Sequence, residues 1–135
     1  MNNTDSPAGI PSALATSAGL TAHVTVADLD RCMRAVREGE LLSPELTTAF
    51  LSPQVVHSTK DTWTEMYGYG LRFCVDRAGK VYCYEKEGVN AGVSGVISHF
   101  PDQDVTVTLL SNMEDGVWDP AWGKIHEMVT NAQLT

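Results

Sequence analysis

Positive charge is scarce in this 135-residue sequence, where 9 Lys and Arg face 17 Asp and Glu and the formal net charge is −8. Nucleic acids and anionic membrane surfaces both attract proteins through clustered Lys and Arg, so neither is expected as a partner. Long apolar runs are missing too, which excludes a membrane-spanning helix. Residues 1–7 have neither the basic start nor the apolar run of a signal peptide, and we therefore expect a cytoplasmic location.

Most sequence patterns of catalytic and metal sites are also missing. There is no Gly-x-Ser-x-Gly turn, no phosphate-binding loop and no dinucleotide-binding glycine pattern. The four histidines and three cysteines match no metal-ligand spacing, so we expect no metal and no cofactor. Cys74 and Cys83 would fall on neighbouring strands, where a disulfide is conceivable. The interpretation we favour is that these two and Cys32 are small, buried and reduced residues.

Apolar residues make up 43% of the sequence, enough for one compact domain with its own core. Residues 1–22 are rich in Ser, Thr, Ala, Gly and Pro, which predicts an irregular surface segment. Thr25 and Asp28 resemble a capping box at the start of a helix that ends at Gly39. Ser43-Pro44 predicts a second, short helix that ends at Ser52-Pro53.

Further along the chain, the apolar period changes to two. Strands are predicted at residues 67–75, 81–86, 92–100 and 105–110, and their short connections favour an antiparallel meander. Tyr82, Tyr84 and Lys86 should share one strand face. Residues 54–66 are polar and predict a loop. Asp119-Pro120 predicts the start of a last helix. Its apolar stripe would contain Trp118, Trp122, Ile125 and Val129. The expected fold class is α+β, with about four antiparallel strands packed against N-terminal helices and a C-terminal helix.

One segment, residues 84–92, has the residue types of a binding site. Lys86 at a strand end would present a positive charge to a carboxylate, and Gly88 would let a ligand approach the backbone. The backbone N–H of Val89 would lie beside that open position, where it could donate to an oxyanion. The alternative from pattern alone is a polar strand end followed by a glycine turn, with Lys86 protecting the edge of the sheet.

Lys86-Glu87-Gly88 resembles the third motif of the serine β-lactamase and penicillin-binding-protein superfamily, Lys-Thr-Gly or its His-x-Gly variant. Gly92 matches a downstream glycine of the class C β-lactamase-related members. Residues 25–29 and 41–45 resemble the family's Ser-Thr-x-x-Asp-Leu helix start and its Leu-Leu-Ser-Pro-Glu continuation. Residues 67–71 are similar to the strand before the motif, and residues 107–112 with Trp118 to the last strand. These similarities extend over residues 17–132 in the family's order.

The resemblance implies that residues 23–135 form the C-terminal part of a β-lactamase-like domain. It implies substrate or oxyanion binding at Lys86, Gly88 and Val89, supported by Glu87 and Gly92. Family members hydrolyse amides, esters or β-lactams through an acyl-enzyme on the Ser of Ser-x-x-Lys, assisted by Tyr-x-Asn or Tyr-x-Ser. Neither pattern occurs here, and Glu87 replaces a usually small residue. We therefore expect no catalytic residue in this chain and no hydrolysis by the chain alone.

Three functional hypotheses follow. The first is a portion of a serine hydrolase whose nucleophile is supplied by a second polypeptide, an N-terminal hydrolase half. The second is a non-catalytic binding or dimerisation module that reuses the β-lactamase-like sheet and pairs with a second copy of itself. The third is an enzyme of another class that uses His57, Asp61 and Glu65. Because these three residues have no diagnostic spacing, a solvated loop is the favoured interpretation of that segment.

Overall fold

The computed structural model describes residues 24–115 and 121–131. In this part of the chain two helices precede a run of six strands, and a third helix follows it. The elements are α2 (Val26–Arg37), α3 (Pro44–Phe50), β1 (Val55–Thr59), β2 (Trp63–Tyr67), β3 (Arg72–Asp76), β4 (Val81–Asn90), β5 (Val93–Phe100), β6 (Val105–Ser111) and α4 (Gly123–Asn131). The predicted α+β class is confirmed, with six strands instead of about four.

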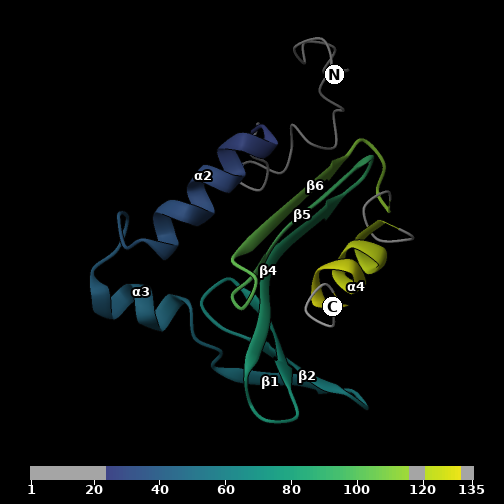
Figure 1. The fold of residues 1–135 in the computed structure, drawn as a ribbon. Coiled ribbons are helices and arrows are strands. Elements are labelled where there is room, and N and C mark those ends of the chain that lie inside the picture. The colour runs from purple at the N-terminus through teal and green to yellow at the C-terminus, as the bar shows by residue number, and fades with distance from the viewer. Residues whose placement is uncertain (1–23, 116–120, 132–135) are drawn as a thin grey trace, which may run out of the picture.

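The six strands form a single antiparallel meander in the order β1-β2-β3-β4-β5-β6, so each strand pairs with its neighbour in sequence. Short turns at residues 76–79 and 101–104 make this order possible, since antiparallel neighbours need only a few connecting residues. The sheet twists strongly, and β1 and β2 run across the direction of β5 and β6 (Figure 1).

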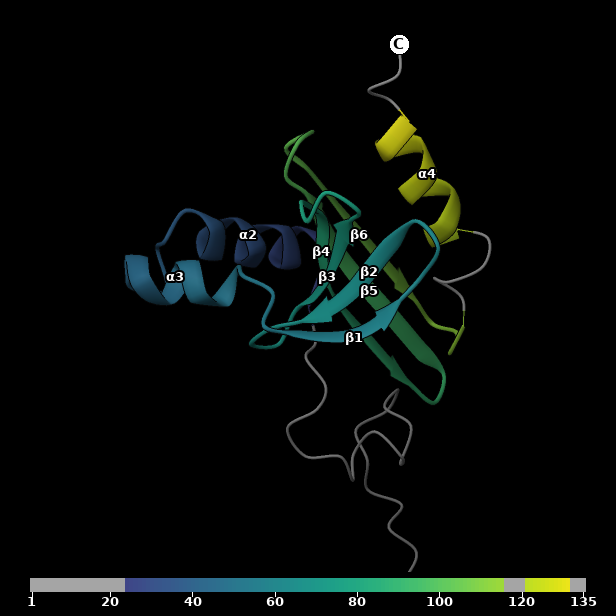
Figure 2. The ribbon, with the colours of Figure 1, turned by 90° about the horizontal axis from the view of Figure 1, so that it is seen from below.

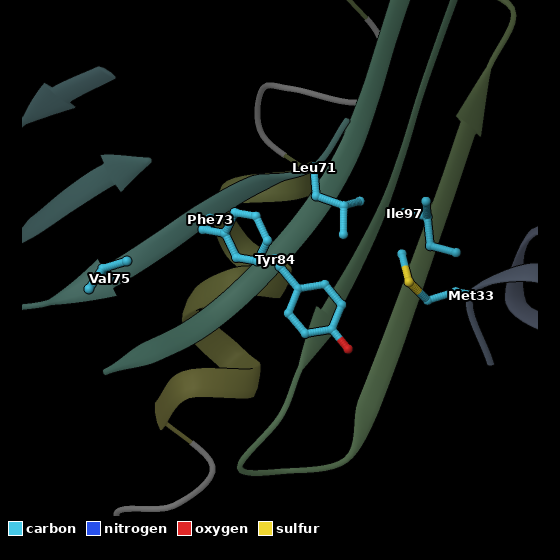
Figure 3. Close-up of a cluster of buried hydrophobic side chains, with 6 residues drawn as sticks. All are labelled: Met33, Leu71, Phe73, Val75, Tyr84 and Ile97. Atoms are coloured by element: carbon cyan, nitrogen blue, oxygen red, sulfur yellow. The ribbon is translucent and has the colours of Figure 1, made fainter. Parts of the chain in front are cut away.

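Helices cover the two faces of the sheet differently. α2 and α3 lie on one side and α4 lies on the other (Figure 2). On the α2 side, Met33 packs against a buried cluster of sheet residues, shown in Figure 3. These residues are Leu71, Phe73, Val75, Tyr84 and Ile97. On the α4 side, Cys74, Cys83 and Phe100 are buried against partly buried residues that include Val129 of α4.

The two N-terminal helices begin as their sequences predict. The Thr25 side chain accepts from the Asp28 backbone N–H, and the Asp28 carboxylate accepts from the Thr25 backbone N–H. This reciprocal pair satisfies two backbone donors that would otherwise have no partner in the first turn. At α3, the Ser43 side chain accepts from the Leu46 backbone N–H, and Pro44 follows Ser43 at the first helical position.

The loop predicted at residues 54–66 is wrong, because this segment forms β1 and β2. β1 is an edge strand with mostly exposed residues, so its sequence lacks the apolar alternation that marks a half-buried strand. In β2, the polar residue Glu65 points inward, where Ser58 and Arg72 bind it. Tyr69 was expected in the next strand, but it is 63% exposed in the β2–β3 turn. Gly70, at φ +99°, permits that turn.

The shared face predicted for Tyr82, Tyr84 and Lys86 is also wrong in part. Cys74 pairs with Cys83, whereas Val75 pairs with Val81, so Tyr82 is an extra residue in β4. This β-bulge interrupts the alternation of side chains. The Tyr82 ring therefore lies on the α4 side, 5.7 Å from the ring of His126. Tyr84 and Lys86 lie on the α2 side.

The expectation of three buried cysteines holds for Cys74 and Cys83, while Cys32 is exposed. All three thiols are free. Cys32 lies at the rim of an apolar pocket beside α2. The predicted irregular segment 1–22, the helix start at Asp119-Pro120 and Trp118 lie outside the described residues. In the segments that are described, no helix is both long enough and apolar enough to span a membrane.

His99 is a buried titratable residue in β5, away from the Lys86 segment. Its Nδ1 lies 2.9 Å from the Thr106 hydroxyl, and its ring stacks at 5.1 Å on Tyr84. Burial and the nearby Arg37 together lower the pKa of His99 to about 4, against the smaller opposing effect of Asp104. Between about pH 6.5 and 4 the unfolded chain therefore binds a proton that the native chain excludes, so acid destabilises the fold.

We expect lowering the pH from 7 to 4 to cost the wild type about 3 kcal/mol more than it costs a His99→Gln variant. Gln keeps a polar side chain near Thr106 but cannot be protonated in this range. Urea denaturation of both proteins at the two pH values measures the difference. An equal loss of stability in both proteins would show that His99 does not carry this pH dependence.

Candidate functional site

The predicted binding segment lies in the second half of β4, where neighbouring residues point to opposite faces. Glu85 is fully buried on the α4 side. Lys86 lies on the α2 side, where it lines a pocket together with Met33 and Ile97. Glu85 therefore points away from Lys86, as the alternation of side chains along a strand requires.

Glu85 binds residues from three other elements. Arg72 of β3 forms an ion pair with one carboxylate oxygen, Oε1. The other oxygen, Oε2, accepts hydrogen bonds from the Ser98 hydroxyl of β5 at 2.7 Å and from the Trp122 indole N–H at 3.1 Å. A buried carboxylate is tolerated when it is paired and its lone pairs are used, and Glu85 meets both conditions. Glu85 thus holds β3, β5 and Trp122 together on the face of the sheet opposite to Lys86.

Arg72 also approaches two further carboxylates, those of Glu65 and Glu87, each at 3.5 Å. The cluster thus places one positive charge among three negative ones, for a formal sum of −2. Burial lowers the pKa of Arg72, but the adjacent Glu85 outweighs it and raises that pKa overall. The guanidinium also lies over the Trp122 ring, 5.6 Å from its centroid. Arg72 is thus paired with carboxylates, although its buried Nε has no hydrogen-bond partner among the described residues. Lys86 makes no ion pair with a described residue, so its charge is available to a ligand.

A pocket of about 350 Å³ lies beside Lys86, where β3 ends and β4 continues. Its lining contains four of the predicted site residues, namely Lys86, Glu87, Gly88 and Val89, together with Tyr67, Gly70, Arg72 and Glu85. A side chain at Gly88 would meet no atom within 4 Å, so this position is open to a ligand. Gly92, the fifth predicted residue, lies in the β4–β5 turn at φ +76°. Gly92 therefore shapes the hairpin and does not line the pocket.

Tyr67 forms part of the pocket wall. Burial raises its pKa, and the neighbouring carboxylates of Glu87 and Glu65 raise it further. The phenol is therefore protonated at neutral pH, where it can donate a hydrogen bond but is a poor base. Tyr67 does not replace the tyrosine of the missing second motif as a proton acceptor.

The backbone of β4 has an open edge at this pocket. β3 pairs with β4 only as far as Arg72 opposite Glu85, whereas β5 pairs with β4 through to Asn90. Among the described strands, residues 86–90 are therefore paired on one side only. The unpaired N–H and C=O groups along such an edge can bind an extended chain or a ligand amide. The N–H of Val89 belongs to this segment.

An apolar pocket of about 320 Å³ adjoins the other side of Lys86. Residues of α2, α3 and the β2–β3 turn line it, among them Leu29, Val36, Phe50 and Tyr69. A second apolar pocket, of about 350 Å³, continues along α3 past Leu46 and Tyr69. Leu46 and Tyr69 are more than half exposed. Lys86 thus lies between a polar pocket and an uncovered apolar surface.

The three residues of the third hypothesis have separate surroundings. The exposed His57 packs its ring against Tyr67, and the Asp61 backbone carbonyl accepts from Arg77. Glu65 is buried and bound by Ser58 and Arg72. These contacts give each residue a structural role and provide no shared catalytic geometry.

A different group of residues converges on the α4 side. Cys74, Cys83 and His126 place their ligating atoms within 4.8 Å of one another. Sequence reasoning missed this group because the three residues are far apart in the chain and match no ligand spacing. The one available signal was the expectation that Cys74 and Cys83 lie on neighbouring strands.

Replacing Arg72 with Met should destabilise the fold by about 3–5 kcal/mol, because it leaves the buried Glu85 without its countercharge. The matched control is Arg34→Met, which breaks the exposed Arg34–Asp30 pair on α2 and should cost less than about 1 kcal/mol. Chemical denaturation measures both. Equal small losses would mean that Glu85 does not depend on Arg72.

Comparisons with known proteins bear on the fold. No protein-family model matches the sequence, and no curated protein matches it either. The fold matches the crystal structure of a penicillin-binding protein from Bacillus halodurans, with a TM-score of 0.68 and 27% identity over 78% of this chain. The chain spans 30% of that protein's length. The structure therefore has a penicillin-binding-protein-like fold that corresponds to part of a larger protein.

Proposed function

We propose that this chain forms one wall of a serine hydrolase active site of the penicillin-binding-protein and β-lactamase type. The Ser-x-x-Lys nucleophile would come from a segment outside these 135 residues. The observation that carries the proposal is the position of Lys86-Glu87-Gly88 on β4. The motif lies beside an open strand edge within a fold that matches a penicillin-binding protein.

The polar pocket would bind the acyl part of a substrate. Lys86 makes no ion pair with any described residue, so its charge is available to a substrate carboxylate. The open edge at residues 86–90 would pair with a substrate amide, and the N–H of Val89 would donate to the oxyanion that develops during acyl transfer. The formal charge of −2 on the Arg72 cluster opposes a carboxylate, which makes Lys86 essential to such binding.

The exposed apolar surface beside Lys86 is a place where the segment that carries the nucleophile would pack. Most of the Bacillus halodurans protein lies outside the region that this chain matches. The pockets along α2 and α3 give an apolar surface adjacent to the motif, which an additional packed layer would cover. A nucleophile carried on that layer would face Lys86 and Gly88. Without that segment, we expect only the binding effects of the wall and no turnover.

A chimaera tests this proposal. Residues 24–131 of this chain would replace the matched segment of the Bacillus halodurans penicillin-binding protein. We expect the folded chimaera to be acylated by a fluorescent penicillin, which is read on a denaturing gel. Lys86→Ala should slow acylation by about 10-fold or more, since charged hydrogen bonds contribute about 1.5–3 kcal/mol. Lys60→Ala, which changes a lysine in the β1–β2 loop, is the matched control.

Cooperative thermal unfolding would show that each chimaera is folded. A folded chimaera that is never acylated contradicts the proposal. So does equal acylation of the Lys86→Ala and Lys60→Ala chimaeras, because Lys86 would then have no part in the site.

The edge strand β1 favours a second candidate function, a homodimerising module. Val55 and Val56 are 60% and 62% exposed on this strand, which pairs only with β2. An exposed apolar edge is a surface for pairing with a second sheet. In this alternative, two copies would join through β1, and the β4 segment would serve as a contact site without catalysis.

Light scattering across a range of concentrations distinguishes the two candidates. A dimer that Val55→Lys converts to a monomer favours the homodimerising module, because a charge on an edge strand opposes pairing. Val26→Lys on α2 is the matched control, at an exposed valine outside the sheet. A protein that stays monomeric at all concentrations contradicts this second candidate.

A further inference from the structure

Two cysteines lie opposite each other on the α4 side of the sheet, away from the Lys86 pocket. Cys74 of β3 and Cys83 of β4 are paired residues of the antiparallel ladder. Their exposed fractions are 1% and 0%, so both thiols lie in the layer between the sheet and α4. The bulge at Tyr82 occurs next to this pair and turns the Tyr82 ring to the same side.

His126 of α4 approaches the two thiols from the other side of this layer. Its ring is enclosed by Tyr82, Phe100 and Trp122, with centroids at 5.7, 5.0 and 4.8 Å. The Nε2 atom of His126 is buried and makes no hydrogen bond with any described residue. A buried polar atom in this condition costs about 1–3 kcal/mol, so a group that binds it would stabilise the fold.

The chemistry of these three side chains is that of a soft metal site. Thiolate and imidazole are the preferred ligands of Zn²⁺, which bonds sulfur at about 2.3 Å and nitrogen at about 2.0–2.1 Å. A tetrahedral centre would separate the ligating atoms by about 3.8 Å or less. The ligating atoms now lie within 4.8 Å of one another, so small side-chain rotations would bring them to that separation. Oxygen-preferring ions such as Mg²⁺ and Ca²⁺ are disfavoured, because no carboxylate belongs to the group.

We propose that Cys74, Cys83 and His126 form a Zn²⁺ site that fastens α4 to the sheet. A pocket of about 370 Å³, lined in part by Tyr82, Gln103 and His126, lies on the outer side of the group. The Oε1 atom of Gln103 is also buried without a hydrogen bond to a described residue. Water in that pocket would supply the fourth ligand and bind Gln103. This proposal does not rest on the proposed hydrolase function, because Cys74, Cys83 and His126 do not line the Lys86 pocket.

The test uses the full chain, reduced and freed of metal, and titrated with Zn²⁺ or with Co²⁺ as a spectroscopic probe. We expect one Zn²⁺ per chain by native mass spectrometry and a thiolate-to-cobalt charge-transfer absorption with Co²⁺. The exposed Cys32 thiol should react quickly with a disulfide reagent with or without Zn²⁺. The buried thiols of Cys74 and Cys83 should react slowly, and Zn²⁺ should slow them further.

Cys74→Ser, Cys83→Ser and His126→Gln should each weaken Zn²⁺ binding by about 100-fold or more, since even outer-shell partners of a metal contribute 10–100-fold. Cys32→Ser is the matched control and should bind Zn²⁺ like the wild type. Zn²⁺ should also raise the midpoint of thermal unfolding of the wild type and of Cys32→Ser. This measurement needs no cluster variant, so it stands even if those variants fail to fold.

Three outcomes would overturn the proposal. The first is a reduced wild type that binds no stoichiometric Zn²⁺. The second is binding that Cys32→Ser abolishes, or that the cluster variants leave unchanged. The third is a Cys74–Cys83 disulfide that forms readily and persists under mild reductant, since the pair would then be a redox couple and not a metal site.

Discussion

The buried carboxylate of Glu85 is the interaction on which the arrangement of this domain depends. It lies at the centre of the sheet and takes an ion pair from β3, a hydrogen bond from β5 and another from Trp122, just before α4. Each of these groups would be costly to leave unpaired in a buried position. Their common dependence on one carboxylate ties Trp122, which is distant in sequence, to the three consecutive strands β3, β4 and β5.

This constraint also divides the chemistry of the domain between the faces of the sheet. Because residues alternate along β4, fixing Glu85 on the α4 side directs Lys86 to the α2 side. The α2 side therefore has a free charge, an open backbone edge and apolar pockets. The α4 side has the carboxylate network and the Cys74–Cys83–His126 group. A change of one residue in the register of β4 would exchange the two faces and remove both arrangements.

The sequence predicts the parts of this fold that depend on neighbouring residues. The capping box at Thr25 and the Ser43-Pro44 helix start are local hydrogen-bond and dihedral effects, and both are present. The loop prediction for residues 54–66 failed because an edge strand needs little burial, so β1 has no apolar alternation that would mark it as a strand. The bulge at Tyr82 was also missed, because one unpaired residue is visible only once both strands are in register.

Only the part of the candidate site that is continuous in sequence could be predicted. The motif at Lys86, Gly88 and Val89 is continuous in sequence, so its residues could be found together and do line one pocket. The partners of Glu85 come from β3, β5 and Trp122 and could not be found, since only the fold brings them together. The same holds for Cys74, Cys83 and His126, whose proximity depends on the pairing of β3 with β4 and on the packing of α4.

The one-sided pairing of β4 has a consequence for selectivity between binding partners. An unpaired edge accepts almost any extended chain, because backbone hydrogen bonds are the same for every sequence. Here the open segment begins with Lys86 and Glu87, one charge on each face, and continues through Gly88 and Val89. A chain that pairs with it would meet the charge of Lys86 on one face and, on the other, Glu87, which already pairs with Arg72. Charged side chains along an edge oppose pairing with uniform apolar strands, which are the usual cause of aggregation at exposed sheet edges.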